Sequence, residues 1–263
     1  MLVFHPKAKI TTPWDVYENR KCDTNLDNGT CGLGIGKTMH RNIKDNQTLT
    51  AIDLMHMGTF KEKIKQISLK SFTHSEMPDW FAKEVHEFWE AVENIEWAIA
   101  NYNFLEGYKT LIFEGSQGVL LDKDHGSFPN VTYSNTTSKN AMEICDILNI
   151  TNRHVYGVTR AYHTRHGNGY FSEDKIELKE SSVPETNVNN KYQGDFKIAR
   201  LDYDLLDYAA AIETMYSIGY KQTLMVTCCN LVHEEDKFYA LNLCSQWYSI
   251  KLSHSPYGEF LPY

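Results

Sequence analysis

The feature that most constrains the fold of this chain is an alternation of strand-like and helix-like segments along its second half. Apolar runs of strand length alternate with longer segments of helical spacing, namely the strands 110–113, 154–159 and 224–227 and the helices 141–148 and 204–217. Such alternation is typical of a mainly parallel sheet whose faces are covered by helices. The sequence therefore predicts an α/β fold, with ligands bound where strands pass into loops at their carboxyl ends.

The first half of the chain has a less regular pattern. Between Pro78 and Tyr102, apolar and aromatic residues recur at steps of three and four, which predicts one amphipathic helix. We interpret its aromatic stripe as core rather than as a surface for stacking bases. Residues 1–50 are rich in polar and turn-forming types and predict a loop-dominated opening. Because no repeat, low-complexity tract or linker interrupts the chain, we expect residues 1–263 to form a single domain.

Composition argues against several classes of protein. The 263 residues carry 26 Lys and Arg against 34 Asp and Glu, a net charge of −8, so we expect no nucleic-acid polymer as a partner. No apolar run reaches the roughly 18 to 20 residues that cross a bilayer, and the amino end lacks the apolar core of a signal peptide. We therefore expect no membrane association and a cytoplasmic location. The 6 cysteines include no C-x-x-C pair and are interpreted as reduced thiols.

A glycine cluster, GTCGLGIGKT at residues 29–38, leaves three interpretations open. Gly36, Lys37 and Thr38 resemble the end of a P-loop, and a kinase-like nucleotidase built on them is one hypothesis. The spacing argues against it, because Cys31 stands where that pattern has its first glycine. The alternatives are a flexible turn without a ligand and a glycine-rich cradle for an anion, in which backbone N–H groups and the Thr30 hydroxyl would donate to a phosphate.

Two polar clusters are candidates for chemistry. Residues 122–125, DKDH, could hold Mg²⁺ or transfer a proton, although a solvated turn is the commoner structure for such a charge run. His163 and His166 are three residues apart, but no carboxylate completes a zinc set at a familiar spacing. We therefore assign no metal site from the sequence.

Three segments of the sequence, taken together, carry the motifs of one known protein family. Residues 113–137, FEGSQGVLLDKDHGSFPNVTYSNTT, are similar to the family's FEGAQGxLLDxDHGTYPxVTSSNTT. Residues 157–171, GVTRAYHTRHGNGYF, are similar to GxxKAYxTRVGxGPF, and residues 29–36, GTCGLGIG, to GTTGRGIG. On these segments the chain resembles the adenylosuccinate synthetase family. The resemblance spans Gly29 to about Pro256, and its compact form looks closer to the short archaeal and phage branch, which includes the 2-aminoadenylosuccinate synthetases.

This resemblance implies a fold and a reaction. The family's parallel sheet flanked by helices is related to that of P-loop nucleotidases, and its members are homodimers that use Mg²⁺. A nucleoside triphosphate, usually GTP, phosphorylates the 6-oxygen of IMP, and the amino group of L-aspartate then displaces the phosphate. We accordingly expect a homodimer whose small-molecule partners are a purine nucleoside monophosphate, L-aspartate, and GTP, ATP or dATP.

The resemblance also implies roles for individual residues. The ligand-binding residues that it implies are, for the purine monophosphate, Thr30, Cys31, Gln117, Thr132, His166 and Gly167; for aspartate, Lys197 and Arg200; and for the base of the triphosphate, Cys228, Asn230, Ser253 and Ser255. Of these, His166 and Gly167 would line the ribose side of the monophosphate. In the family a TKxD element reads guanine with its aspartate, whereas residues 227–230 are TCCN here. An amide has one donor and one acceptor group, so we expect ATP or dATP to be used at least as well as GTP.

The family's amino-terminal elements have no counterpart in this sequence. Neither the phosphate loop WGDEGKGK, which supplies the catalytic aspartate, nor the HxGH segment with the catalytic histidine occurs before Gly29. We therefore expect an amino-truncated domain that lacks the first strand, the P-loop, the catalytic pair and the Mg²⁺ ligands, and that is inactive as an isolated chain. The alternative is a non-catalytic purine-nucleotide-binding paralogue or a regulatory partner of an intact synthetase.

Overall fold

The computed structural model describes residues 1–21, 30–45, 47–71, 77–187, 189, 191–236, 247, 249–255 and 260–262. The chain divides into two compact units, Met1–Leu111 and Ile112–Tyr263. The single domain expected over residues 1–263 stays a prediction.

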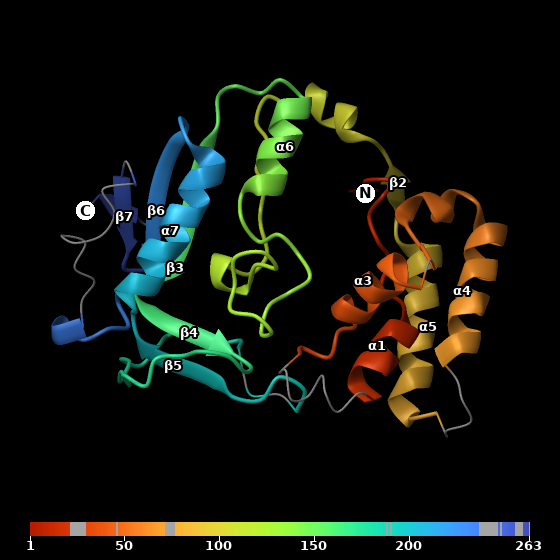
Figure 1. Ribbon diagram of the computed structural model, residues 1–263, viewed down its shortest axis with the longest axis horizontal. Coiled ribbons are helices and arrows are strands. Elements are labelled where there is room, and N and C mark those ends of the chain that lie inside the picture. Colours follow the sequence, from red (N-terminus) through yellow and green to blue (C-terminus); the bar gives the residue numbers. More distant parts are fainter. Residues whose placement is uncertain are drawn as a thin grey trace. The chain divides into compact units, whose positions relative to one another are not determined.

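Helices dominate the first unit (Figure 1). Its elements are β1 (Leu2–Phe4), α1 (Pro13–Lys21), α3 (Ile35–Ile43), α4 (Met57–Ser71), α5 (Asp79–Asn94) and β2 (Trp97–Ile99), with 3-10 turns at Ala51–Met55 and Tyr102–Gly107. β1 and β2 pair in parallel, with Val3 opposite Ala98. The helices enclose an apolar core made of Trp14, Tyr17, Leu49, Phe60, Ile64, Ile67 and Phe81.

The predicted helix of the first unit forms, but it is shorter than expected. Its aromatic stripe belongs to the core, since Phe81 is 2% exposed and its ring centroid lies 5.9 Å from that of Trp14. α5 ends at Asn94 rather than at Tyr102, because the backbone becomes extended at Ile95 and the chain then pairs as β2 with β1.

The expected loop-dominated opening over residues 1–50 is wrong, because α1 and α3 both lie in this range. α1 has no apolar stripe that a sequence pattern could reveal, because its buried residues include polar Asp15 and Asn19 as well as Trp14 and Tyr17. The polar residues bond to neighbouring segments, so tertiary contacts stabilise this helix where periodicity gives no indication of it.

A sheet in the order β3 (His154–Arg160), β6 (Lys221–Thr227), β7 (Ser249–Ser253) and β8 (Phe260–Pro262) forms the centre of the second unit. The first three strands are parallel, and β8 is antiparallel to β7. An antiparallel ribbon of β4 (Tyr162–His166) and β5 (Phe196–Arg200) follows β3. The α-helices among the described residues of this unit are α6 (Lys139–Ile147) and α7 (Tyr203–Ser217), the latter contributing Ala210 to the core of the sheet (Figure 1). The predicted α/β class with a mainly parallel sheet is confirmed.

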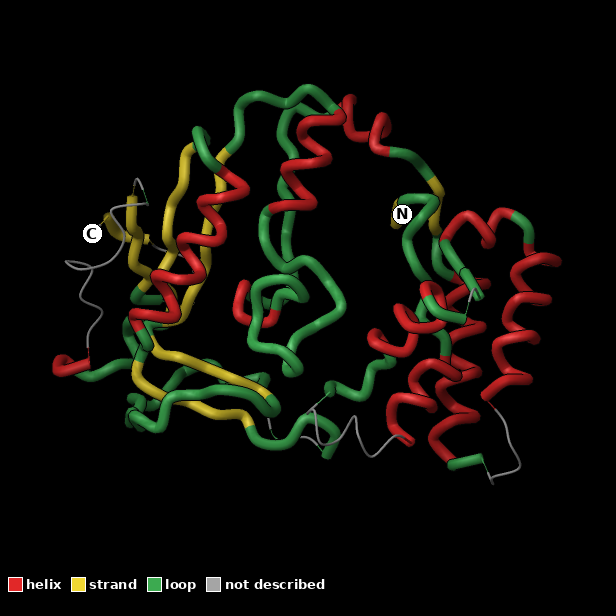
Figure 2. The backbone as a smooth tube through the Cα atoms, in the orientation of Figure 1, coloured by secondary structure: helices red, strands yellow, loops and turns green. Residues whose placement is uncertain are grey.

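One predicted strand of this half of the chain is wrong. Residues 110–113 form no strand among the described residues, and Ile112 is 90% exposed, so this apolar run has no sheet neighbour to bury it. The polar segment that follows is a loop as expected, with a single described 3-10 turn at Val119–Leu121, and Figure 2 shows it leading into α6.

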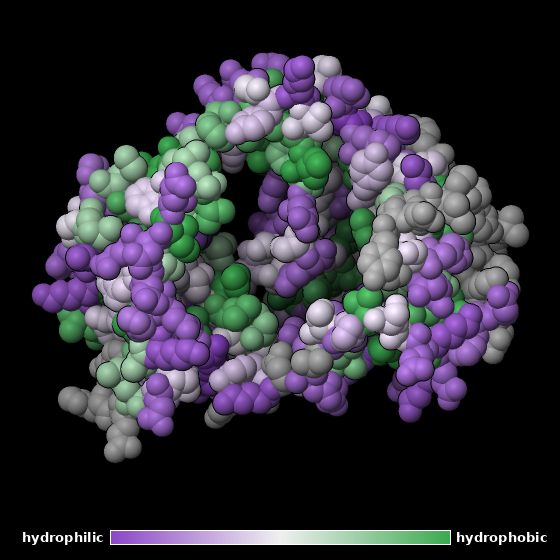
Figure 3. Space-filling model, turned by 180° about the vertical axis from the view of Figure 1, so that it is seen from behind, coloured by the Kyte–Doolittle hydropathy of each residue, from purple (hydrophilic) through white to green (hydrophobic). Residues whose placement is uncertain are grey.

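None of the helices in the described part of the chain is both long and apolar enough to cross a membrane. Hydrophilic residues cover much of the face drawn in Figure 3. The mean hydropathy of −0.46 agrees with such a surface.

Candidate functional site

The glycine loop, residues 30–34, runs into α3 and is bonded to α1. Asn19 of α1 donates from Nδ2 to the Thr30 hydroxyl at 3.1 Å and accepts the Gly34 N–H at 3.2 Å. Gly34 has a φ of +79°, and a Cβ atom there would lie 2.7 Å from the Val16 nitrogen. Only glycine therefore fits at this position.

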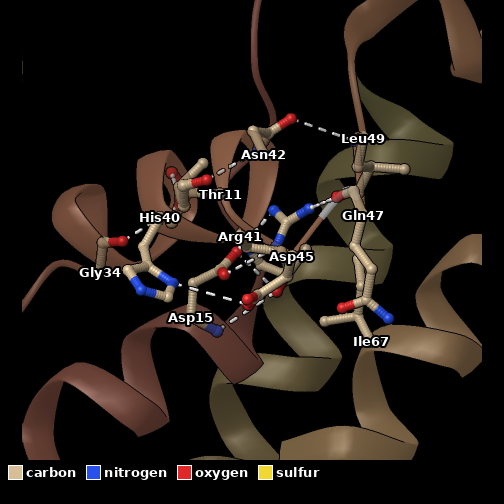
Figure 4. A network of polar contacts seen from close by, with 12 residues as sticks. Thr11, Asp15, Gly34, His40, Arg41, Asn42, Asp45, Gln47, Leu49 and Ile67 are labelled. Atoms are coloured by element: carbon tan, nitrogen blue, oxygen red, sulfur yellow. Dashed lines mark hydrogen bonds and ion pairs between the residues drawn. The ribbon is translucent and has the colours of Figure 1, made fainter.

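A buried ion pair fixes the helix that follows this loop (Figure 4). Arg41 of α3 donates from Nε and Nη2 to the two carboxylate oxygens of Asp15, each at 2.9 Å. The guanidinium also donates to the carbonyls of Gln47 and Ile10, and Asp15 accepts the N–H and hydroxyl of Thr12. Arg41 and Asp15 are only 5% and 4% exposed, so this pair joins α1, α3 and their flanking segments inside the unit.

The first turn of α3 does not have the properties of a P-loop. The threonine hydroxyl of a P-loop binds the metal ion, but Thr38 is 3% exposed and lies 2.9 Å from the Thr11 hydroxyl. Burial therefore argues against the kinase-like hypothesis. Thr30 and Cys31 lie partly buried at the start of the glycine loop, and Gly29 lies outside the described residues. Their contact with a phosphate stays a prediction.

The motif loop, residues 113–138, is closed on itself by one buried carboxylate. Asp122 is 1% exposed and accepts the N–H of Asp124 at 2.8 Å and the N–H of Thr136 at 2.6 Å, one on each oxygen. Burial alone would raise the pKa of Asp122, but these backbone hydrogen bonds outweigh it and the pKa lies below its usual value. Asp122 therefore accepts hydrogen bonds from backbone amides. The residues that follow it, 123–125, form the turn that such a charge run suggests, with Lys123 and Asp124 exposed.

Gln117 and Thr132, the residues expected to hold the monophosphate, both lie on the motif loop. Gln117 has a φ of +65°, a left-handed conformation that is rare outside glycine, and its side chain is exposed. The Thr132 N–H donates across the loop to the Leu121 carbonyl at 2.8 Å. Strained backbone persists mainly where it serves binding or catalysis, which makes Gln117 the strongest candidate for a ligand contact in this loop.

Contacts with α7 hold the motif loop in place. The His125 Nε2 lies 2.7 Å from the Tyr216 hydroxyl, and the Tyr208 hydroxyl donates to the His125 carbonyl, also at 2.7 Å. The Glu213 carboxylate accepts the Ser138 N–H at 3.0 and 3.1 Å. Burial raises the pKa of Glu213. A rigid helix of the same unit therefore supports the loop at both its middle and its end.

His166, Gly167 and Lys197 lie together at one end of the β4–β5 ribbon. The Lys197 ammonium donates to the Gly167 carbonyl at 3.2 Å, and the His166 Nε2 lies 3.1 Å from the Gly194 carbonyl. The structure thus brings one expected aspartate ligand beside the two expected ribose-side residues.

Arg200 lies apart from Lys197 although both belong to β5. Three positions separate them, so their side chains leave opposite faces of the strand. Arg200 instead forms ion pairs with Asp174 and Asp236. These two cations therefore do not form a joint clamp for one carboxylate.

His163 and His166 are likewise on opposite faces of β4. Burial lowers the pKa of His163, and its Nδ1 has no hydrogen-bond partner among the described residues. Within the described residues no group of three or more His, Cys, Asp or Glu side chains is placed to hold a metal ion.

The residues expected to read the triphosphate base meet at the carboxyl ends of β6 and β7. The Cys229 N–H donates to the Ser253 carbonyl at 3.1 Å, and the Ser253 hydroxyl donates to the Ser255 carbonyl at 2.9 Å. Cys228 has a left-handed φ of +59°, and Asn230 is exposed. Ligands of parallel sheets bind at this edge, although the role of these residues as base readers stays a prediction.

Sequence reasoning missed an ion pair at the carboxyl end of β3. Arg160 donates to the Glu185 carboxylate at 2.7 Å and to the Tyr162 hydroxyl at 3.2 Å. The hydrogen bond from Arg160 lowers the pKa of Glu185 to about 2. Arg160 lies within the segment 157–171 that resembles the family, and this position was the only sign of it in the sequence.

Known proteins resemble this chain over most of its length. A family model of adenylosuccinate synthetase matches residues 2–225. The adenylosuccinate synthetase of Clostridium botulinum (strain Eklund 17B / Type B) is 32% identical over 193 residues, which are 67% of this chain and 44% of that protein. The one of Ehrlichia canis (strain Jake) is 33% identical over 170 residues, which are 61% of this chain and 39% of that protein.

A solved structure shows the same fold. The fully ligated adenylosuccinate synthetase from Plasmodium falciparum matches with a TM-score of 0.58 at 20% identity, covering 86% of this chain and 55% of that one. The chain thus spans about half the length of the relatives that it matches. Since the family model covers most of its residues, this chain belongs to the adenylosuccinate synthetase family.

Proposed function

We propose that this chain binds a purine nucleoside monophosphate through its motif loop and belongs to a ligase that joins L-aspartate to the 6-position of IMP or a related purine. The observation that supports the proposal is Gln117, an exposed side chain held in a left-handed conformation within the segment most similar to the family. The reaction uses a nucleoside triphosphate because the 6-oxygen is a poor leaving group until it carries a phosphoryl group.

Calorimetry with IMP, GMP and dGMP tests the monophosphate site. We expect at least one of them to bind, and Gln117→Ala to weaken its binding by about 1 to 3 kcal/mol, since a polar partner is then left unsatisfied. Gln66→Ala, which changes an exposed glutamine of the first unit, is the matched control and should leave the affinity unchanged. Unaltered affinity in Gln117→Ala would place the site elsewhere.

The triphosphate preference is proposed to depend on Asn230. An aspartate there would accept two N–H groups of guanine, whereas the amide can accept from the 6-amino group of adenine and donate to its N1. We therefore expect ATP or dATP to bind at least as well as GTP, and Asn230→Asp to shift the ratio of affinities towards GTP. A parent chain that strongly favours GTP, with no shift in the variant, would mean that Asn230 does not read the base.

Aspartate binding is proposed for the ribbon, with Lys197 rather than Arg200 as the cation closer to the ribose-side residues. Lys197 bonds only to a carbonyl in the described contacts, while Arg200 already pairs with two carboxylates. The Mg²⁺ that the family uses is proposed for the complete enzyme. Among the described residues no group of three or more His, Cys, Asp or Glu side chains is placed to hold a metal ion, and both oxygens of Asp122 accept backbone N–H groups.

We also propose that a polypeptide of this 263-residue sequence does not complete the reaction by itself, since it contains neither WGDEGKGK nor HxGH. Loss of a general base commonly costs about 10²- to 10⁴-fold in rate. An assay with IMP, L-aspartate and GTP or ATP checks this, and robust turnover by the pure polypeptide would overturn it. A homodimer and a cytoplasmic location are proposed on the family resemblance, and analytical ultracentrifugation tests the first.

A further inference from the structure

Gln117 and Thr132 are far apart in sequence, yet one set of hydrogen bonds determines the backbone beside both. The Thr132 N–H donates to the Leu121 carbonyl at 2.8 Å, and the Leu121 N–H donates to the Gly118 carbonyl at 2.9 Å. Gly118 directly follows Gln117 in the chain. The two ends of the expected monophosphate site are therefore connected through the carbonyl of Gly118.

Thr136 is the residue that closes this set of bonds. Its hydroxyl donates to the same Gly118 carbonyl at 2.8 Å, and its N–H donates to the Asp122 carboxylate at 2.6 Å. Because Asp122 is buried and also accepts the N–H of Asp124, the position of Thr136 is well determined. Thr136 thus links the buried Asp122 carboxylate to the backbone next to Gln117 through two hydrogen bonds.

A left-handed residue other than glycine needs such a constraint. The conformation costs about 1 to 2 kcal/mol relative to the right-handed region, so an unconstrained loop would relax away from it. Such strain persists only where the surrounding contacts over-determine the backbone. In the motif loop, the bond from the Thr136 hydroxyl holds the carbonyl of the residue next to Gln117.

We propose that Thr136 is a positioning residue for the monophosphate site: its hydroxyl, placed by the Asp122 carboxylate, keeps Gln117 in the left-handed conformation in which its side chain meets the nucleotide. This inference rests on the proposed function of Gln117. Thr136 acts through Gln117, so its contribution is to affinity rather than to chemistry.

The test uses two substitutions that differ in the hydroxyl alone or in the methyl group alone. Thr136→Val keeps the shape but removes the donor, and Thr136→Ser keeps the donor. With IMP, GMP and dGMP as probes in calorimetry on the full chain, we expect Thr136→Val to weaken binding about tenfold, which is about 1.4 kcal/mol of binding free energy. Thr136→Ser should stay within about twofold of the parent chain.

Thr214→Val is the matched control. It removes another threonine hydroxyl of the second unit, whose hydrogen-bond partners, the Ala210 carbonyl at 2.9 Å and the Gln222 Oε1 at 3.3 Å, both lie outside the motif loop. Its monophosphate affinity should equal that of the parent chain. Thermal unfolding of each variant identifies any that fails to fold, and Thr136→Ala then replaces Thr136→Val.

The outcomes separate this inference from the proposed function. If Gln117→Ala weakens binding but neither Thr136→Val nor Thr136→Ala does, Thr136 does not position Gln117. Equal weakening in Thr136→Val and Thr136→Ser also overturns the inference, because the hydroxyl is then not the cause. If no probe binds the parent chain, or if Gln117→Ala binds like the parent, the proposed function itself fails and the inference fails with it.

Discussion

The glycine loop of the first unit and the motif loop of the second are each held by a buried aspartate, but the two carboxylates have different partners. The Asp15 carboxylate accepts hydrogen bonds from the Nε and Nη2 groups of Arg41, each at 2.9 Å. Asp122 accepts the backbone N–H groups of Asp124 and Thr136. The first arrangement joins two helices through charges that must remain paired, whereas the second determines the path of a single loop.

The two loops also differ in which residues take left-handed conformations. In the glycine loop these are Gly32 and Gly34, with φ of +71° and +79°, whereas the motif loop has Gln117 at +65°. A ligand bound by backbone N–H groups favours glycine, since no Cβ obstructs its approach. A ligand bound by a side chain needs a residue that has one, even in a strained conformation. The contacts proposed for the monophosphate would accordingly come from backbone N–H groups in the glycine loop and from a side chain in the motif loop.

The largest predicted effect comes from breaking the ion pair of the first unit. Arg41→Met leaves the Asp15 carboxylate buried without its charge partner, which typically costs about 3 to 5 kcal/mol. Urea unfolding followed by tryptophan fluorescence measures this loss, because four of the 5 tryptophans, Trp14, Trp80, Trp89 and Trp97, belong to the first unit.

Lys83→Met is the control for this change. It removes one partner of the exposed Lys83–Glu87 pair, whose side chains are 76% and 55% exposed, and should cost less than about 0.5 kcal/mol. Replacing both buried partners, as Asp15→Asn with Arg41→Met, should cost less than Arg41→Met alone. Equal losses for Arg41→Met and Lys83→Met would show that burial does not set the cost.

The second effect tests the need for glycine in the glycine loop. Gly34→Ala should cost about 2 to 4 kcal/mol, because the new Cβ adds left-handed strain and meets the backbone of Val16 and Asp15 at 2.7 and 2.8 Å. Gly219→Ala separates the two causes, since Gly219 has a φ of +83° but nothing within 4 Å of the added Cβ. Only the strain of about 1 to 2 kcal/mol should remain there. If Gly34→Ala and Gly219→Ala lowered the free energy of unfolding by similar amounts, the steric contribution at Gly34 would be ruled out.

Asp122→Asn should have an intermediate effect on the motif loop. The amide keeps one oxygen but presents an NH₂ group to the other backbone donor, and an unsatisfied buried group costs about 1 to 3 kcal/mol. Amide hydrogen exchange should show faster exchange at Asp124 and Thr136, the two N–H groups bonded to the carboxylate. Unchanged exchange at both would mean that the loop does not depend on Asp122.

Asp122 of the motif loop and Glu213 of α7 should contribute to the pH dependence of the unfolding free energy with opposite signs. The folded pKa of Asp122 is lowered, so its contribution is present above its ordinary value of 3.8 and is lost as the pH falls through the folded pKa. The folded pKa of Glu213 is raised, so its contribution is present below 4.5 and is lost as the pH rises through the folded pKa. Urea unfolding between about pH 2 and 7 should show that Asp122→Asn removes the part of the acid dependence that Asp122 contributes below 3.8, and that Glu213→Gln removes the part that Glu213 contributes above 4.5. The same pH profile in both variants would contradict this assignment.

Sequence reasoning succeeded for one kind of feature and failed for another. α7, β3 and β6 were predictable because their apolar spacing is local, and the motif loop was recognisable from its run of family-like residues. α1 was not, because it is stabilised by a buried polar pair, Asp15 with Arg41, whose partners are 26 positions apart. The role of Asp122 could not be predicted for the same reason. The DKDH sequence around it is typical of a solvated turn or a metal site, and only the structure shows that the N–H of Thr136, which is 14 positions away, donates to its carboxylate.

The smallest predicted effect distinguishes the backbone strain at Gln117 from the contact of its side chain with the monophosphate. Gln117→Gly should raise the free energy of unfolding of the second unit by about 0.5 kcal/mol, because glycine avoids the left-handed cost of about 1 to 2 kcal/mol but loses about 0.5 to 1 kcal/mol in chain entropy. Gln117→Ala keeps the strain and should leave stability nearly unchanged.

Both Gln117 substitutions should weaken monophosphate binding equally if the side chain is the ligand contact. Asn149→Gly is the matched control, because Asn149 also has a left-handed φ, of +53°, but lies just after α6 and outside the motif loop. It should give a comparable or smaller gain in stability with no change in calorimetric affinity. If Asn149→Gly weakened binding as much as Gln117→Gly, relief of strain anywhere in the unit would account for the loss. The distinction drawn between the glycine loop and the motif loop would then not hold, because a left-handed side chain would no longer mark the residue that meets the ligand.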